Sequence, residues 1–309
     1  MPAHGEPTFT VVICTFNRAH VLPRAVDSVL GQTCSDYELV VVDDGSTDDT
    51  WSLIGSFTDP RIRGVHQANA GLGAARNAGI AAARGRYVVF LDDDDLAFPT
   101  WLARFAAELD GDPGVVSCGN VEADDSGRIV RTLLPKQLGP AFAGCVGRFL
   151  AGTFVVRRDA LEAVGGFRAG LPHLQQTELV LRLLPECRAR GWDVRAIPEP
   201  LVQLHTGGPR RAGIDNTTKL LAAMEVVLAE QADVLARSPW VLAQYSAMAG
   251  VAAARTGEYR TARRHLRTAV RVRPRAWKHW ARLGLASVPP IGRLVWQRQD
   301  RRAVVSLPA

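Results

Sequence analysis

The amino-acid sequence predicts an α/β fold: a doubly wound, mostly parallel sheet flanked by helices, followed by an all-helical subdomain. Two observations lead to this prediction. Short apolar runs rich in β-branched residues alternate with amphipathic stretches over the first hundred residues, which is the pattern of βαβ units with right-handed crossovers. From Thr217 onward the periodicity is helical, and Gly207-Gly208-Pro209 separates the two regions. We therefore expect one domain over residues 1–208 and a helical subdomain over 209–309.

The first hundred residues supply the alternation of strands and helices. Runs that are almost wholly apolar, as expected of strands covered by helices on both faces, occur at 9–14, 38–42 and 87–91. Helical patterns occur at 22–30, 48–57 and 73–83. In an open α/β sheet, ligands bind beyond the carboxyl ends of the strands. These ends carry Thr15, the pair Asp43-Asp44 and the run Asp92-Asp93-Asp94-Asp95.

The overall composition is that of an ordinary soluble globular protein, with 47% hydrophobic and 22% charged residues. The five cysteines are odd in number and lack a C-x-x-C pair, which indicates a reducing compartment and neither a disulfide framework nor a zinc site. The first residues lack a signal-peptide pattern, and no stretch of about 18 residues is both apolar and free of charge. We therefore expect a cytoplasmic protein, with peripheral contact to a membrane left open.

Basic residues are concentrated towards the C-terminal end. Residues 255–309 hold 14 Lys and Arg and two acids, whereas residues 1–254 hold 23 basic and 29 acidic residues. Such a basic tail could bind an anionic membrane surface, an acidic partner or a second copy of the chain. It could also bind nucleic acid, which we do not expect here. A solvated, Arg-rich helix face explains the charge equally well.

One segment of this tail has a repeat-like pattern. Gly257-Glu258-Tyr259-Arg260-Thr261-Ala262, followed by Leu266, Ala269 and Pro274, resembles the second half of a tetratricopeptide repeat. In that motif, small and large apolar residues interlock two antiparallel helices. A single half-match predicts a helical hairpin rather than a repeat array.

Four consecutive carboxylates at the end of an apolar strand, Asp92 to Asp95, are costly unless a positive charge neutralises them. A hard divalent cation does so, because Mg²⁺ and Mn²⁺ take one or two carboxylates together with substrate phosphates. An aspartate run can also form only a turn or a helix cap. The second pair, Asp43-Asp44, at another strand end favours the cation.

Four motifs occur in order along this part of the chain. They are Thr10-Val11-Val12-Ile13-Cys14-Thr15-Phe16-Asn17-Arg18, Val42-Asp43-Asp44-Gly45-Ser46-Thr47-Asp48, Arg76-Asn77-Ala78-Gly79 and Phe90-Leu91-Asp92-Asp93-Asp94-Asp95. Together they resemble the nucleotide-binding half of family 2 inverting glycosyltransferases, which have the GT-A fold. The resemblance covers roughly residues 8–205. It implies a nucleotide-sugar half at about 8–100 and an acceptor half at about 113–208.

The resemblance implies roles for individual residues. The nucleotide-sugar would be contacted by Thr15, Phe16, Asn17, Arg18, Asp44, Arg76, Asp92 and Asp93. In this D-x-D element Asp92 would bind the ribose or a metal-bound water, and Asp94 would bind the metal itself, with His205 completing the metal shell. The cofactor implied is a divalent cation, Mn²⁺ or Mg²⁺. Each position also has a plain structural alternative: a strand end, a turn, a solvated helix residue or a structural histidine.

The family mechanism is a direct displacement in which a carboxylate takes the proton of the attacking hydroxyl. In the family this carboxylate belongs to a Glu-Asp pair just before a helix. Gln175-Gln176 occupy the corresponding position here, and glutamine cannot act as a base. Glu178 is the local carboxylate and is the predicted base, while stabilisation of the first helical turn is its alternative role.

On the acceptor side, Gly152-Thr153-Phe154 and Gly165-Gly166-Phe167 resemble the family's acceptor segments. Phe154, Phe167, Trp192 and His173 are therefore candidates for the acceptor pocket, although such aromatic residues are more often part of a core. The expected acceptor is a small molecule, a lipid-linked sugar or a peptide.

The predicted function is metal-assisted transfer of a sugar from a nucleoside-diphosphate-sugar to an acceptor hydroxyl, with inversion. A nucleotidyltransferase would want a Gly-rich loop with a basic residue after the first strand, which Thr15-Phe16-Asn17-Arg18 does not supply. Gln175-Gln176 keep open a second hypothesis, a catalytically impaired binding or scaffold protein that acts through its helical tail.

Overall fold

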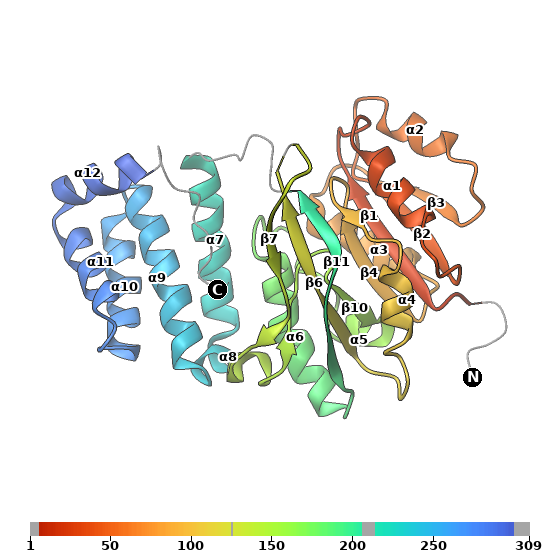
Figure 1. The fold of residues 1–309 in the computed structure, drawn as a ribbon. Coiled ribbons are helices and arrows are strands. Elements are labelled where there is room, and N and C mark those ends of the chain that lie inside the picture. Colours follow the sequence, from red (N-terminus) through yellow and green to blue (C-terminus); the bar gives the residue numbers. More distant parts are fainter. Residues whose placement is uncertain (1–5, 125, 206–213, 300–309) are drawn as a thin grey trace. The chain divides into compact units, whose positions relative to one another are not determined.

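The computed structural model describes residues 6–124, 126–205 and 214–299 (Figure 1). The chain forms two compact units. The first comprises Met1–Leu171 and Gln175–Gly208, and the second comprises Pro172–Leu174 and Pro209–Ala309.

A nine-stranded mixed sheet forms the centre of the first unit, in the order β3-β2-β1-β4-β10-β6-β11-β5, with β7 paired to β6. Its strands are β1 Phe9–Thr15, β2 Tyr37–Asp43, β3 Ile62–His66, β4 Tyr87–Asp92, β5 Leu96–Ala97, β6 Val115–Ala123, β7 Ile129–Leu133, β10 Phe154–Arg157 and β11 Val194–His205. The pairings among β1 to β4 and between β6 and β11 are parallel, whereas β10 runs antiparallel to both β4 and β6. A separate two-stranded sheet joins β8 Lys136–Gln137 to β9 Val146–Gly147.

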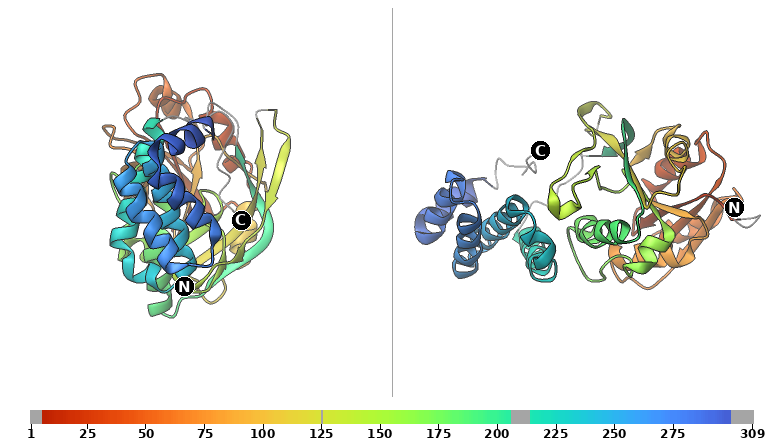
Figure 2. Two further views of the ribbon diagram at one scale, coloured as in Figure 1. Left: turned by 90° about the vertical axis from the view of Figure 1, so that its left-hand side faces the viewer. Right: turned by 90° about the horizontal axis from the view of Figure 1, so that it is seen from below.

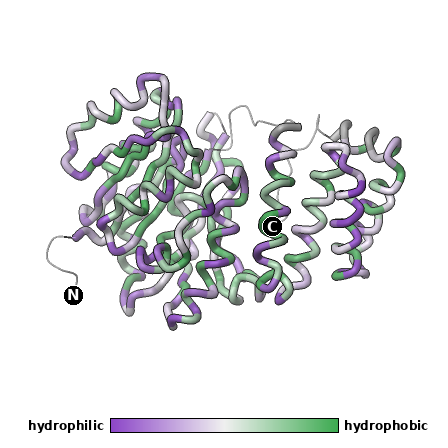
Figure 3. Tube along the Cα trace, turned by 180° about the vertical axis from the view of Figure 1, so that it is seen from behind, coloured by the Kyte–Doolittle hydropathy of each residue, from purple (hydrophilic) through white to green (hydrophobic). Residues whose placement is uncertain are grey.

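Helices cover both faces of the large sheet, which confirms the predicted α/β class (Figure 2). They are α1 Leu22–Leu30, α2 Thr50–Ser56, α3 Leu72–Ala82, α4 Trp101–Ala106, α5 Arg158–Ala163 and α6 Gln175–Ala189. Because successive strand residues point to opposite faces, Val11 and Ile13 join the core under α1 and α4. Val12 joins the core under α3 and α6. Both faces are apolar, so the strands are hydrophobic along most of their length (Figure 3).

Local sequence explains several element boundaries. Pro23 stands in the first turn of α1, where the missing N–H costs nothing. Gly71 precedes α3 with a φ of 86°, a conformation that favours glycine. A Cβ on Gly79 would clash with the Val12 side chain, so this glycine lets α3 pack closely on β1.

The second unit is all-helical. Its helices are α7 Ile214–Glu230, α8 Ala232–Ala236, α9 Pro239–Arg255, α10 Tyr259–Val272, α11 Trp277–Ser287 and α12 Pro289–Gln299. Small residues on α9 let α10 approach closely, since a Cβ on Gly250 would lie 2.6 Å from Leu266 Cγ. In the described ranges every helix is too short or too polar to cross a lipid bilayer.

Candidate functional site

Three polar strand ends meet at one edge of the large sheet. β1 lies between β2 and β4, and its register pairs Thr15 with Asp43 and Cys14 with Asp92. The carboxyl ends of the three parallel strands therefore lie side by side. This placement brings Thr15 and the two aspartate motifs of the sequence to one edge of the sheet.

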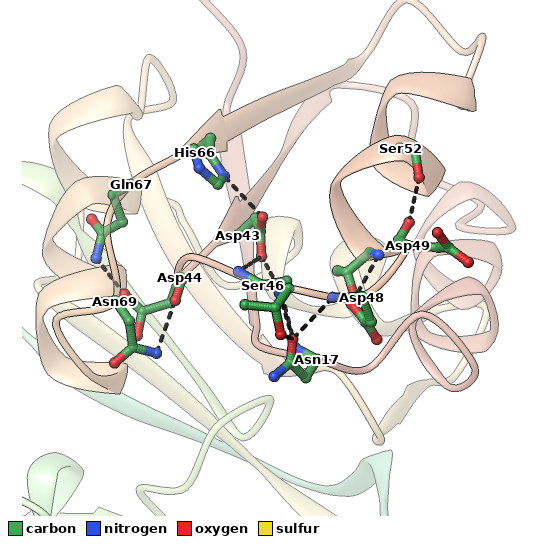
Figure 4. A network of polar contacts seen from close by, with 12 residues as sticks. Asn17, Asp43, Asp44, Ser46, Asp48, Asp49, Ser52, His66, Gln67 and Asn69 are labelled. Carbon is green, nitrogen blue, oxygen red and sulfur yellow. Dashed lines mark hydrogen bonds and ion pairs between the residues drawn. The ribbon is translucent and has the colours of Figure 1, made fainter.

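The turn after β2 is held together by its own aspartates (Figure 4). Asp43, fully buried, accepts hydrogen bonds from Ser46 and from Nδ1 of His66, the latter at 2.9 Å. Asp44 accepts from Gln67 Nε2 at 2.7 Å and from the backbone N–H groups of Ala70 and Gly71 at 2.9 and 2.8 Å. Both carboxylates thus fix the loop that leads into α3.

Asn17 ties the loop after β1 to the loop after β2 (Figure 4). It has a φ of 54°, its N–H donates to Ser46 Oγ at 2.8 Å, and its Oδ1 accepts from the Thr47 N–H at 2.7 Å. The backbone N–H of Arg18 donates to Thr50 Oγ1 at 3.1 Å. The backbone around Arg18 is therefore anchored, whereas the neighbouring Phe16 ring is exposed.

Arg18 reaches across this edge to the aspartate run. Its Nη1 atom lies 3.1 Å from Asp93 Oδ1 and 2.6 Å from Asp94 Oδ2. Burial raises the pKa of Asp93 to about 6. Burial, followed by the charge of Asp92, also raises the pKa of Asp95. The guanidinium thus lies where negative charge is concentrated and poorly solvated.

Arg76 forms a second cationic contact with the run, from inside the fold. Only 2% exposed, it donates from Nη2 to Asp92 Oδ1 at 2.8 Å and from Nη1 to Gln175 Oε1 at 2.8 Å. With the Gln176 amide oxygen turned towards Arg76, that oxygen accepts from Nη2 and Nη1 at 3.0 and 3.2 Å. The Phe167 ring centroid lies 5.2 Å from the Arg76 guanidinium carbon. The two glutamines therefore serve as neutral acceptors for a buried arginine.

Two further contacts belong to this edge. The backbone N–H of His205, the last residue of β11, donates to Asp95 Oδ1 at 2.8 Å. The Thr15 hydroxyl is buried beside Asp93 and, in the described part of the chain, makes no hydrogen bond of ordinary geometry. A buried hydroxyl whose contact with a neighbouring carboxylate has poor geometry can be satisfied better by a ligand atom.

Glu178 is paired with an arginine of its own helix. The residue is 1% exposed, and its two oxygens accept from Arg182 Nε and Nη2 at 2.7 and 2.6 Å. Arg182 also donates to the backbone carbonyls of Val164 and Gly166. This geometry favours the helix-stabilising role of Glu178 over the role of base that the resemblance implies.

The acceptor-side candidates are dispersed. Phe154 is 2% exposed and packs edge-on against Phe149, with ring centroids 5.4 Å apart. Trp192 contacts the guanidinium groups of Arg157 and Arg190, at 4.8 and 5.0 Å. His173 belongs to Pro172–Leu174 of the second unit. Phe167 is brought to the site, where its ring contacts the Arg76 guanidinium.

The aspartates do not form a closed metal cage. Among the described residues, no three His, Cys, Asp or Glu side chains are grouped to hold a metal ion. Among the described residues, Arg18 and Arg76 form ion pairs with Asp92, Asp93 and Asp94 at 2.6 to 3.1 Å. The side chains of Asp92 and Asp94 are 42% and 33% exposed, so both are open to a ligand from solvent.

Solved structures resemble this fold. The structure of residues 1–349 of TarS from S. aureus in complex with UDP-GlcNAc has a TM-score of 0.62 at 17% identity, over 96% of this chain and 92% of that one. The mannosyltransferase PcManGT from Pyrobaculum calidifontis, in complex with GDP-Man and Mn²⁺, has a TM-score of 0.55 at 20% identity, over 95% and 88% of the two chains. At these identities the likeness establishes the fold.

Sequence comparison establishes more. The succinoglycan biosynthesis protein ExoO of Rhizobium meliloti is 38% identical over 145 residues, which are 44% of this chain and 42% of that protein. The chain thus matches less than half of this relative's length. Residues 10–165 match the model of glycosyl transferase family 2. This match spans half of the chain and includes β1, β2 and β4 with their polar ends, so the chain belongs to glycosyltransferase family 2.

Proposed function

We propose that this protein transfers a sugar from a nucleoside-diphosphate-sugar to an acceptor hydroxyl, with inversion and with the help of Mn²⁺ or Mg²⁺. The observation that carries this proposal is the convergence of Thr15, Arg18, Arg76 and the run Asp92–Asp95 at adjacent strand ends. Two arginines facing a row of carboxylates, next to the buried Thr15 hydroxyl, suit a ligand that carries both phosphates and hydroxyls.

The donor would use groups that the protein already holds in place. Arg76 is held in place by Asp92 and Gln175, with the Phe167 ring beside it, and would bring a positive charge to the donor's phosphates. Thr15 and Asp44 would contact the nucleoside from β1 and β2, and the exposed Phe16 ring is available to its base. The complexes of TarS with UDP-GlcNAc and of PcManGT with GDP-Man support a donor of this class.

The donor set fits a cation that is shared with the substrate. Mg²⁺ and Mn²⁺ accept one or two carboxylates and complete their shells with phosphate oxygens and water. The partly exposed Asp92 and Asp94 would provide such carboxylates, with His205 at the same edge, and a three-residue cage is not required. When bound, the cation would stabilise negative charge on the departing diphosphate. The Mn²⁺ complex of PcManGT supports this assignment.

For Glu178 we propose a positioning role. Its pairing with Arg182 fixes the first turns of α6, where Gln175 and Gln176 face Arg76. The absence of a carboxylate at 175–176 favours a second function, a binding protein that holds a nucleotide-sugar without turning it over. A transfer assay with the bound donor separates the two, since only the enzyme releases the nucleoside diphosphate.

We propose residues 1–208 as the catalytic domain and residues 209–309 as a helical, tetratricopeptide-like interaction subdomain. The interlocking of Gly250 with Leu266 between α9 and α10 supports a hairpin of this kind. Its basic surface suits a membrane or a second copy of the chain, and the acceptor would be a small molecule, a lipid-linked sugar or a peptide.

The proposed donor site is tested by thermal shift. Nucleoside diphosphates and nucleotide-sugars are screened with and without Mn²⁺, and one nucleotide family is expected to raise the melting temperature clearly more when Mn²⁺ is present. Ligand at about 100 times its Kd stabilises the native state by about 2.7 kcal/mol, which is a readily measured shift. Asp110, exposed and distant in sequence from every site motif, provides the control substitution Asp110→Asn. A screen in which no nucleotide stabilises the protein would refute the proposal.

A further inference from the structure

Three tryptophans are exposed in the helical unit. Trp277 is 71% exposed, Trp280 is 53% exposed and Trp240 is 48% exposed. The indole N–H of Trp280 donates to the carbonyl of Pro274 at 2.8 Å, so its polar atom is satisfied within the protein. Exposing large aromatic rings to water is unfavourable. A group of such rings on a surface therefore usually marks a site that contacts a membrane or another molecule.

Chain topology places the three tryptophans at one end of the unit. Trp240 is the second residue of α9, and Trp277 and Trp280 lie in the first turn of α11. Because α10 runs back between these helices and connects to α11 through 273–276, the start of α9, the end of α10 and the start of α11 share one end (Figure 1). We call this the tryptophan end.

Positive charge is concentrated at the same place. The exposed residues Arg237, Arg271, Arg273, Arg275 and Lys278 lie at or between these helix ends. None of the five forms an ion pair with any described residue. Residues 259–299 contain eleven Lys and Arg and no acidic residue, whereas a merely solvated helix face usually mixes both signs.

We infer that the tryptophan end is a docking surface for a membrane that contains anionic lipids. Indole rings prefer the level of the lipid headgroups, where an apolar body and a polar tip are both accommodated. Unpaired Lys and Arg beside them are attracted to anionic headgroups. The inference deepens the interaction role proposed for the helical subdomain, and it does not depend on the donor site.

Other partners fit the same surface less well. A nucleic acid would use aromatic rings as stacking platforms within a basic groove. Among the described residues no ring contact joins Trp240, Trp277 and Trp280, which lie in the first turns of α9 and α11. An acidic protein would use the basic residues but would leave this much indole surface unexplained.

The experiment uses the full chain and sedimentation with vesicles of phosphatidylcholine, either pure or with about one third phosphatidylglycerol. The protein is expected to sediment with the anionic vesicles and to remain in solution with the neutral ones. The double variants Trp277→Ala/Trp280→Ala and Arg273→Gln/Arg275→Gln should each bind the anionic vesicles at least about tenfold more weakly. Brominated lipids should quench the tryptophan fluorescence of the wild type more strongly than that of the tryptophan variant, which keeps Trp240.

The matched control removes exposed apolar surface from the opposite end of the unit. Val288 and Ile291 are 46% and 52% exposed, and Val288→Ser/Ile291→Ser should leave vesicle binding unchanged. Circular dichroism and nucleotide-dependent thermal shift check that each variant is folded and that its donor site is intact. The inference would be overturned if the wild-type protein did not bind anionic vesicles, or if the control variant lost as much vesicle binding as the two test variants. Binding to duplex DNA in place of vesicles would also overturn it.

Discussion

Arg18 Nη1 lies 2.6 Å from Asp94 Oδ2 and 3.1 Å from Asp93 Oδ1. The guanidinium thus occupies the side of the aspartate run where the proposed cation would bind. A cation that arrives with the donor has to displace Arg18 from Asp94, and the anchored Arg18 backbone leaves the freed side chain close to the phosphates. The same arginine would therefore oppose binding of a bare cation and favour binding of the diphosphate.

Arg18→Gln is expected to strengthen the binding of Mn²⁺ alone and to weaken the binding of a nucleoside diphosphate without metal. Because Arg18 is 44% exposed, each change should be modest, about two- to fivefold. Calorimetric titration measures both. The exposed Arg24→Gln on α1 is the matched control. Unchanged Mn²⁺ affinity in Arg18→Gln would show that the guanidinium does not compete with the cation.

Arg76→Met is expected to destabilise the fold and to abolish donor binding. It removes the donor shared by Asp92, Gln175 and Gln176 and leaves the buried Gln175 oxygen unsatisfied, at a cost of about 1–3 kcal/mol. Arg76→Lys keeps the charge but cannot reach all three acceptors, so an intermediate loss is expected. Urea unfolding measures stability, with the exposed Arg84→Met as control. A stable Arg76→Met protein with normal donor affinity would contradict this assignment.

If Glu178 has a positioning role, a double-mutant cycle should show that its contribution to stability is coupled to that of Arg182. Glu178→Gln and Arg182→Met should each destabilise the protein by about 3 kcal/mol, and the double variant should lose clearly less than the sum. Transfer activity, assayed where each variant is folded, should be similar in all three. A base behaves differently: its loss costs about 10²–10⁴ in rate, and removing Arg182 cannot restore it. A loss of rate of this size in Glu178→Gln that Arg182→Met does not restore would identify Glu178 as the base.

We expect the stability of the helical unit to depend on pH because of His279. Burial, followed by the charges of Arg282 and Arg273, lowers the pKa of this imidazole below its ordinary 6.5. The unfolded chain therefore binds a proton more readily than the folded chain, so stability should fall as the pH drops from above 6.5 through the folded pKa. Melting temperatures of wild type and His279→Gln are compared between pH 7.5 and 5, at about 0.5-unit steps.

The control for this prediction is His20→Gln, because His20 is exposed. His279→Gln should flatten the acid side of the melting profile, whereas His20→Gln should retain the wild-type slope. Parallel profiles for wild type and His279→Gln would exclude this histidine as the source of the pH dependence.

Much of the fold could be predicted because its determinants are local in the sequence. Continuous apolar runs at 9–14, 38–42 and 87–91 can only be strands that are buried on both faces, and the structure confirms them within β1, β2 and β4. The antiparallel insertion of β10 between β4 and β6 could not be predicted, since it depends on the pairing of segments that are 66 to 70 and 37 to 41 residues apart, respectively.

The contacts within the site depend on long-range pairing in the same way. No local pattern indicates that Gln175 lies against Arg76, or that Arg18 spans to Asp94, because those partners are 99 and 76 residues apart. The Glu178–Arg182 pair is the exception. Its i, i+4 spacing on a helical stretch is a recognised signal of an ion pair within one helix, so the pairing itself could have been predicted from the sequence.

The central claim, a nucleotide-sugar site built on the aspartate run, is tested most directly by calorimetric titration of the donor found in the thermal-shift screen. Titrations of wild type, Asp94→Asn and Asp110→Asn are run with and without Mn²⁺. The predicted result is Mn²⁺-dependent binding in wild type and Asp110→Asn and no Mn²⁺-dependent binding in Asp94→Asn. Equal, Mn²⁺-dependent affinity in all three proteins would contradict the account.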